Sequence, residues 1–90
     1  MIPVRPYKDR VLVRVYPAET LYDGPILAPS ADFLLGEIKW RLADVIRSAV
    51  EEVPEGVQVI IERDSGTMLF YDGEQYRVLF PSSILAVVEP

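Results

Sequence analysis

Short runs of β-branched and aliphatic residues, separated by glycine and proline turns, are the feature that most restricts the fold of this chain. The clearest turn is Asp72-Gly73, which stands between two such runs. An Asp-Gly pair in that position is a strong signal for a tight β-hairpin. Many short strands with frequent turns are typical of a small barrel or sandwich, so we expect an all-β fold. The expected strands cover residues 10–16, 57–61, 67–71, 74–80 and 83–89.

The first expected strand has one clearly apolar face. Its residues Val11, Val13 and Val15 lie on the same side, because successive side chains of a strand alternate between the two faces. Leu12 then points to the opposite side, toward solvent or a contact between subunits. We expect Arg14, which shares that side, to be solvated.

The middle of the chain, residues 37–53, has two interpretations. Apolar residues recur there at spacings of three and four, as in an amphipathic helix. These residues are Ile38, Leu42, Val45, Ile46, Ala49, Val50 and Val53. Residues 36–42 also alternate as a strand would, with Ile38, Trp40 and Leu42 pointing inward, and the pattern leaves both interpretations open. No glycine or asparagine lies between Leu42 and Pro54, so we predict that Asp44 to Glu52 do not form a tight hairpin.

A long segment, residues 17–32, follows neither the strand nor the helix period. Prolines and a glycine interrupt it, yet it carries bare aliphatic side chains at Leu21, Ile26 and Leu27. Loops longer than about 12–15 residues in a compact domain are usually functional or disordered. We therefore expect a mobile loop whose aliphatic residues have a partner.

Two missing residue types restrict the chemistry. The chain has no cysteine, which excludes disulfides and thiolate metal sites and favours a reducing compartment. It has no histidine, which removes the usual general base and the commonest transition-metal ligand. The acidic residues from Asp44 to Glu55 lack the ligand spacing of a calcium loop, so we expect a solvated surface there. The sequence predicts no catalytic residue, no metal site and no cofactor.

Length and charge limit the partners. A chain of 90 residues forms one small domain, residues 1–90, whose modest core makes oligomerisation a common route to stability. The net charge of −5 argues against nucleic acid, because affinity for nucleic acid depends on neutralising phosphates. No apolar run is long enough for a signal peptide or a membrane span, so we expect a cytoplasmic protein.

Several segments, in order along nearly the whole chain, resemble co-chaperonins of the GroES type (the chaperonin-10 family). The opening Val4-Arg5-Pro6-Tyr7-Lys8-Asp9-Arg10-Val11 is similar to the family's Arg-Pro-Leu-x-Asp-Arg-Val segment, and residues 83–89 are similar to its closing Asp-Ile-Leu-Ala-Val-Val-Glu. The other matching segments are Asp23-Gly24-Pro25-Ile26-Leu27, Gly36-Glu37-Ile38, Gly56-Val57-Gln58-Val59 and Ser65-Gly66-Thr67.

The resemblance implies a subunit with a partly open β-barrel, seven copies of which form a ring over an ATP-driven GroEL-type chaperonin. It implies that the mobile loop binds the chaperonin, through Leu21, Gly24, Pro25, Ile26 and Leu27. It also implies that the first segment of one subunit pairs with the last strand of its neighbour. The implied interface residues are Ile2, Val4, Arg5, Ile84, Leu85 and Val87.

Two departures from the family pattern are visible. Pro25 replaces the first aliphatic residue of the loop tripeptide. Residues 43–53 stand where the family builds a glycine-bearing roof hairpin, and their helical spacing favours a short helix or an altered roof. These departures favour a divergent member, for example one encoded by a phage. The alternative function is that of a monomeric or dimeric β-barrel module that binds nucleic acid or a small ligand.

Overall fold

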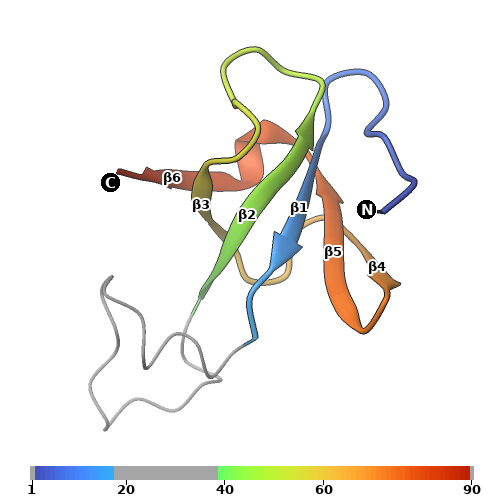
Figure 1. The fold of residues 1–90 in the computed structure, drawn as a ribbon. Helices are drawn as coiled ribbons and strands as arrows, with labels where there is room; N and C mark the ends of the chain where they lie inside the picture. The colour runs from blue at the N-terminus through green and yellow to red at the C-terminus, as the bar shows by residue number, and fades with distance from the viewer. Residues whose placement is uncertain (1, 18–38, 90) are drawn as a thin grey trace, which may run out of the picture.

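The protein folds as one antiparallel β-sheet, seen in a computed structural model that describes residues 2–17 and 39–89. Its six strands are β1 (Val11–Val15), β2 (Trp40–Ser48), β3 (Gln58–Glu62), β4 (Thr67–Tyr71), β5 (Glu74–Leu79) and β6 (Ile84–Val88). They lie in the order β4-β5-β1-β2-β3-β6, so β4 and β6 form the two edges (Figure 1). The sheet is not closed, and the expectation of an all-β fold is confirmed.

The hairpin expected at Asp72-Gly73 joins β4 to β5. Both residues have positive φ, 51° and 79°, which is the backbone of the tightest hairpin turns. The turn sets Tyr71 opposite Glu74, and the pairing continues to Thr67 opposite Val78. The tight hairpin at Asp72-Gly73 is therefore confirmed.

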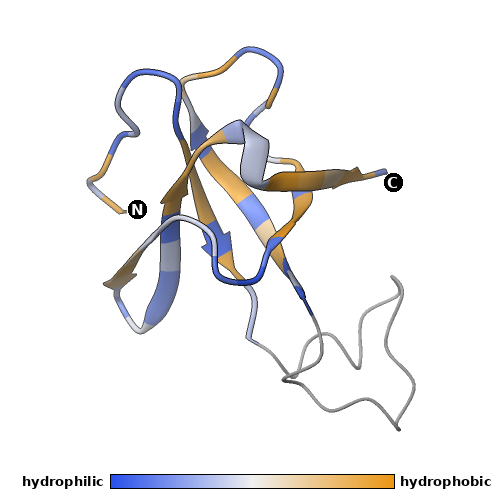
Figure 2. Cartoon of the chain, turned by 180° about the vertical axis from the view of Figure 1, so that it is seen from behind, coloured by the Kyte–Doolittle hydropathy of each residue, from blue (hydrophilic) through white to orange (hydrophobic). Residues whose placement is uncertain are grey.

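The main core lies on one face of the sheet. Val11, Val13 and Val15 of β1 are buried there together with residues of the neighbouring strands. The other buried members are Ala43, Val45, Val53, Val59, Ile61 and Leu79. Figure 2 shows that hydrophobic residues run along the central strands and the whole of β6. The main core therefore lies on the face of β1 that carries the three valines, as the sequence predicts.

The opposite face carries a second, smaller core, and here the expectation for Leu12 was wrong. Leu12 is fully buried, packed with Ile2 and Tyr76, and partly buried aliphatic residues surround it. The chain before β1 folds back over this face, and the alternating residues Ile2 and Val4 cover Leu12. A strand of a sheet that is covered on both sides buries both of its faces.

The helical interpretation of residues 37–53 was also wrong for the residues that the structure describes. Trp40–Ser48 is strand β2, which pairs with β1 on one side and β3 on the other. Leu42 and Ile46 pack on one face while Val45 packs on the other, and the ladder with β1 is shifted between Leu12 and Val13. A central strand with two apolar faces and an irregular register loses its two-residue period, so its spacing imitates a helix.

The chain after β2 forms turns and does not pair with β2 as a tight hairpin. Val53 donates a backbone hydrogen bond to Val50 over 3.2 Å, and Gly56 donates one to Val45 over 2.8 Å. Val53 is buried in the main core, which draws this turn over the end of the sheet. Across Asp44 to Glu52, the strand part therefore pairs with β1 and β3, and the chain returns to it only at Gly56, too far along the sequence for a tight hairpin.

Helical structure in residues 2–17 and 39–89 is limited to one 3₁₀ turn, η2 (Pro81–Ser83), just before β6. Within those residues, no helix has the length and apolar character that crossing a bilayer requires.

Candidate functional site

The five residues expected to bind a chaperonin, Leu21, Gly24, Pro25, Ile26 and Leu27, lie outside the described residues. The structure does describe the two points between which their segment runs. The chain leaves β1 through Tyr16 and Pro17 and re-enters the sheet at Trp40, the first residue of β2. The Tyr16 amide donates a hydrogen bond of 2.9 Å to the Leu42 carbonyl. Both ends of the segment are therefore held at the same end of the central strand pair.

A hydrogen-bonded network fixes this attachment point. The Arg14 guanidinium donates to one Asp44 carboxylate oxygen over 2.9 Å, and the Tyr16 hydroxyl donates to the other over 3.1 Å. The Gln58 amide in turn donates to the Tyr16 hydroxyl over 3.1 Å. The hydrogen bond to Asp44 is the main reason that the pKa of Arg14 is raised, and Glu74 adds to the effect. The network joins β1, β2 and β3 where the segment begins.

An apolar cluster lies on the same face as this network. Leu42 is buried at its centre, and Tyr16, Trp40, Ile60 and Val88 pack around it. Trp40 and Leu42 thus share a face, as the strand interpretation predicts, but they contact this cluster and not the main core. Asp44, expected on a solvated acidic surface, instead lies half-buried in the network.

The first segment of the chain runs extended along the second core. Ile2, Val4 and Pro6 point toward their own sheet, while Pro3 and Arg5 are exposed. Ile2 is only 2% exposed, so its side chain already packs within its own subunit. Of the three interface candidates in this segment, Arg5 is the one with an exposed side chain.

Strand β6 carries the other three interface candidates. It is an edge strand that pairs with β3 alone among the described residues. Leu85 and Val87 are 55% and 48% exposed, whereas Ile84 packs partly against the main core. An edge strand with exposed aliphatic side chains is a surface that a second chain can pair with.

The two sets of interface candidates do not meet within one chain. Figure 1 shows the first segment beside β5 and β4, and shows β6 on the other side of the sheet. A contact between them needs two copies of the chain.

Sequence reasoning missed two surfaces. Met68 and Phe70 on the edge strand β4 are 48% and 73% exposed. Their alternation with Leu69, which packs against the second core, could have indicated an uncovered face. The second is a basic hollow that Arg5, Lys8 and Arg47 line. Because β2 lies far from the first segment in the sequence, no local pattern could have brought these three residues together.

No family model matches the chain. Individual proteins do match it along almost its full length. A co-chaperonin GroES of Corynebacterium jeikeium is 32% identical over 97 aligned positions, covering 98% of this chain and 96% of that protein. A co-chaperonin GroES of Acetivibrio thermocellus is 35% identical, covering 96% of this chain and 98% of that protein.

The chain belongs to the GroES co-chaperonin family. A co-chaperonin GroES of Cutibacterium acnes, 36% identical over 96% of this chain and 95% of its own length, gives the same result. Because these matches cover almost the whole chain, the family membership applies to both terminal segments and to the segment between β1 and β2. The GroES-type fold expected from the sequence is consistent with the open antiparallel sheet.

Proposed function

We propose that this chain is the subunit of a co-chaperonin ring that caps a GroEL-type chaperonin and assists ATP-dependent protein folding. The observation that carries the proposal is identity of 32–36% to co-chaperonin GroES proteins over 96–98% of the chain. The same observation favours a co-chaperonin over a β-barrel module for nucleic acid or a small ligand. The chain has no catalytic role in this proposal, because the partner chaperonin hydrolyses ATP.

In the proposed ring, each subunit offers the edge strand β6 to its neighbour. Leu85 and Val87 give that edge its exposed apolar side chains. The first segment of the next subunit pairs with it through the backbone of Ile2 and Val4, because the Ile2 side chain is already buried. A contact between two different surfaces of identical chains repeats from copy to copy, and it forms a closed ring when the rotation between neighbours closes. We propose seven copies.

The chaperonin contact is proposed for residues 17–32, with Ile26 and Leu27 as anchors. Ordering a flexible loop costs on the order of 1–2 kcal/mol per residue. Burying one isoleucine or leucine returns only about 1.5–3 kcal/mol. One loop therefore binds weakly, but several loops on one ring act together through their effective concentration. Pro25 lowers the ordering cost, because its φ is already restricted in the free loop.

The functional test compares the wild-type ring with a ring that carries Ile26→Ser and Leu27→Ser. The assay is inhibition of a GroEL-type ATPase, together with nucleotide-dependent co-sedimentation. We expect the substituted ring to keep its size and to lose capping. The control is a ring with Ala18→Ser and Ala31→Ser. These substitutions also introduce two polar side chains into the loop, and we expect this ring to cap normally. Capping by the doubly substituted ring at wild-type strength would refute these anchors.

The assembly test uses Leu85→Asp and measures particle mass by light scattering. A buried aspartate has no counter-charge at an apolar contact, so we expect monomers or small species. Met68→Asp, on the other edge strand and 48% exposed, is the matched control and should leave the ring intact. If wild-type protein is monomeric at micromolar concentration, the ring is wrong and the binding-module function gains support. Deleting the first five residues is a poorer test, because it removes the buried Ile2.

A further inference from the structure

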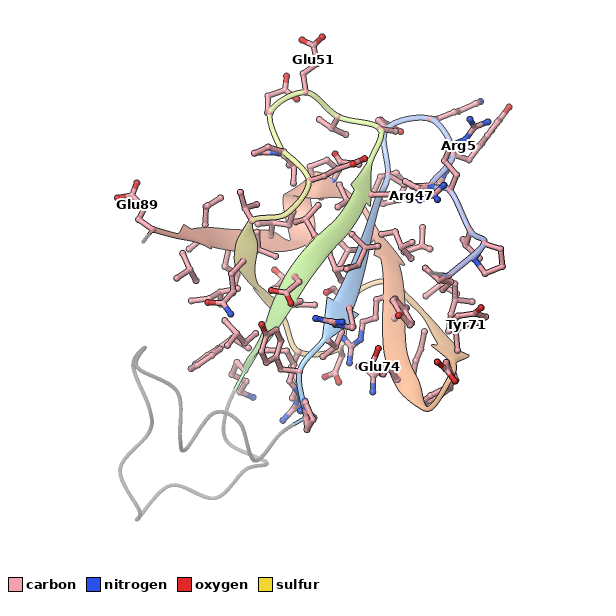
Figure 3. The ribbon with its side chains drawn as sticks, viewed as in Figure 1. Arg5, Arg47, Glu51, Tyr71, Glu74 and Glu89 are labelled. Atoms are coloured by element: carbon pink, nitrogen blue, oxygen red, sulfur yellow. The ribbon has the colours of Figure 1, made fainter. Side chains whose placement is uncertain are left out.

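A hollow of about 540 Å³ opens at the end of the sheet where the first segment meets the end of β2. Arg5 and Lys8 line it from the first segment, Arg47 lines it from β2, and Glu55 lines it from the turn that follows β2. Figure 3 shows the side chains of Arg5 and Arg47 on the same side of the molecule, close to the first segment. Three cationic side chains from two distant parts of the sequence therefore surround one space.

The charge in this hollow is unusual for the chain. The protein has 9 basic and 14 acidic residues, yet the described residues that line this hollow include three basic side chains and one acidic side chain. That carboxylate, on Glu55, already accepts a hydrogen bond of 3.2 Å from the Ser48 backbone amide. The described lining thus carries more basic than acidic side chains, and two of its three cations are arginines, which bind carboxylates with two parallel hydrogen bonds.

The backbone holds Lys8 in a restricted position. Its φ is 58°, in the left-handed region, which costs a residue with a side chain about 1–2 kcal/mol. Its ammonium group lies 5.5 Å from the centre of the Tyr7 ring, within the range of a cation–π contact. Strained residues that the surrounding structure holds in place occur often at functional sites.

An acidic counterpart lies at the same end of the molecule. Glu51 and Glu52 are adjacent and exposed in the turn after β2. Figure 3 shows Glu51 pointing outward from this turn, away from Arg5 and Arg47. The acidic turn therefore does not fill the basic hollow of its own chain. One end of the subunit offers a basic hollow on one side and an acidic turn on another.

We propose that the basic hollow of one subunit receives Glu51 and Glu52 of the adjacent copy. The inference rests on the proposed ring and names a second contact in it. Charge complementarity supports a second copy as the occupant, and so does the position of Arg5, which belongs both to the hollow and to the proposed β6 contact. Figure 1 shows the turn after β2 on the β6 side of the sheet, so copies joined through β6 and the first segment would also bring the turn of one copy toward the first segment of the next. This contact adds electrostatic selectivity to the apolar pairing at β6.

The contact makes ring stability depend on salt. Exposed charges attract each other less at high ionic strength, because the screening length falls from about 10 Å at 0.1 M to about 3 Å at 1 M. We expect the subunit dissociation constant of the wild-type ring to rise with salt, and that rise to disappear when the turn loses its charge.

The decisive experiment is a charge swap, read out as the subunit dissociation constant by sedimentation and native mass spectrometry without any chaperonin. Reversing the charge of the turn with Glu51→Lys and Glu52→Lys should raise the subunit dissociation constant about tenfold or more. Reversing the charge of the hollow with Lys8→Glu and Arg47→Glu should have the same effect. Combining all four substitutions should return the subunit dissociation constant to within about threefold of the wild-type value, because the attraction is restored with opposite signs.

The matched control is Glu62→Lys with Asp64→Lys, which makes the same change in net charge at two other exposed acids. It should leave the ring intact. Glu51→Gln with Glu52→Gln is a milder variant that tests the same contact if a reversed variant fails to fold, as judged by circular dichroism. The proposal is overturned if the turn variants assemble as well as the control, or if the variant with all four substitutions does not assemble better than the two reversed variants. A wild-type protein that never assembles would instead refute the ring itself.

Discussion

Arg77 donates a hydrogen bond of 3.1 Å from its guanidinium to the backbone carbonyl of Ser65. The same nitrogen also donates to the Arg63 carbonyl, and the ε-nitrogen donates to the Gln75 side chain over 3.0 Å. Arg77 is 5% exposed, and this burial lowers its pKa, with nearby Arg41 adding to the effect. A buried cation on β5 thus holds the connection between β3 and β4 in place, and none of its hydrogen-bond partners among the described residues is a carboxylate.

Arg77→Ala should destabilise the subunit by about 2–4 kcal/mol, because two carbonyls lose a charged donor and a cavity forms. Arg77→Lys should recover only part of that loss, since an ammonium group cannot reproduce the planar arrangement of donors. The measurement is the free energy of unfolding by denaturant at fixed protein concentration, which holds any contribution of assembly constant. A loss below about 0.5 kcal/mol for the alanine variant would show that the carbonyls find water instead.

Gly66→Ala should be far more damaging than Gly73→Ala, although the two glycines have nearly the same φ, 77° and 79°. A Cβ at Gly66 would lie 2.8 Å from the Val78 carbonyl oxygen and 2.9 Å from the Leu79 Cβ, whereas nothing lies within 4 Å at Gly73. We expect about 1–2 kcal/mol for the left-handed backbone at Gly73, and a further 1–3 kcal/mol or more for the clash at Gly66. Thermal unfolding of both variants checks this, and equal losses would contradict the proposed clash.

Asp44→Ala should destabilise the sheet by about 1–2 kcal/mol, because Asp44 accepts hydrogen bonds from Arg14 and Tyr16. The ion pair itself adds little, since the Arg14 side chain is 39% exposed and solvent screens the attraction. Asp64→Ala is the control, because Asp64 also pairs with an arginine but is 82% exposed. It should change the free energy of unfolding by about 0–0.5 kcal/mol. Similar losses for both variants would mean that the hydrogen bonds to Asp44 contribute no more than an exposed ion pair.

Tyr76 should make the protein less stable in alkali. Burial, followed by the nearby Glu74 carboxylate, raises the pKa of Tyr76 above its ordinary value of 10.0. The folded protein then keeps the phenolic proton at a pH where the unfolded chain has released it. The resulting stabilisation is complete below the ordinary pKa and is lost as the pH rises through the raised one.

Tyr76→Phe should therefore flatten the fall of the free energy of unfolding above pH 10, measured by denaturant titrations at several pH values. At neutral pH the cost should be small, about 0.5–1 kcal/mol, because the hydrogen bond to Glu74 is long at 3.3 Å. Tyr7→Phe, which removes a hydroxyl from an exposed ring, is the control. An unchanged slope for Tyr76→Phe would rule out this tyrosine as the source.

Several parts of the fold could be predicted because their causes are local. The Asp72-Gly73 turn follows from the ability of these two residues to adopt positive φ, and the main core follows from the alternation of valines in β1. The sites proposed for binding and assembly came from resemblance to a family, not from the spacing of the residues alone. Leu21, Ile26 and Leu27 lie outside the described residues, and their role remains a proposal.

By itself, the sequence determined the all-β class, five of the six strands to within a residue or two, and the family, because turns and alternation act over a few neighbouring residues. Only the tertiary structure decided the state of residues 40–48 and the burial of Leu12 and Arg77. Leu12 is buried because Ile2 folds back from the chain end, and β2 is a strand because β1 and β3 pair with it on both sides. Such contacts join residues far apart in the sequence, so a local sequence pattern cannot predict them.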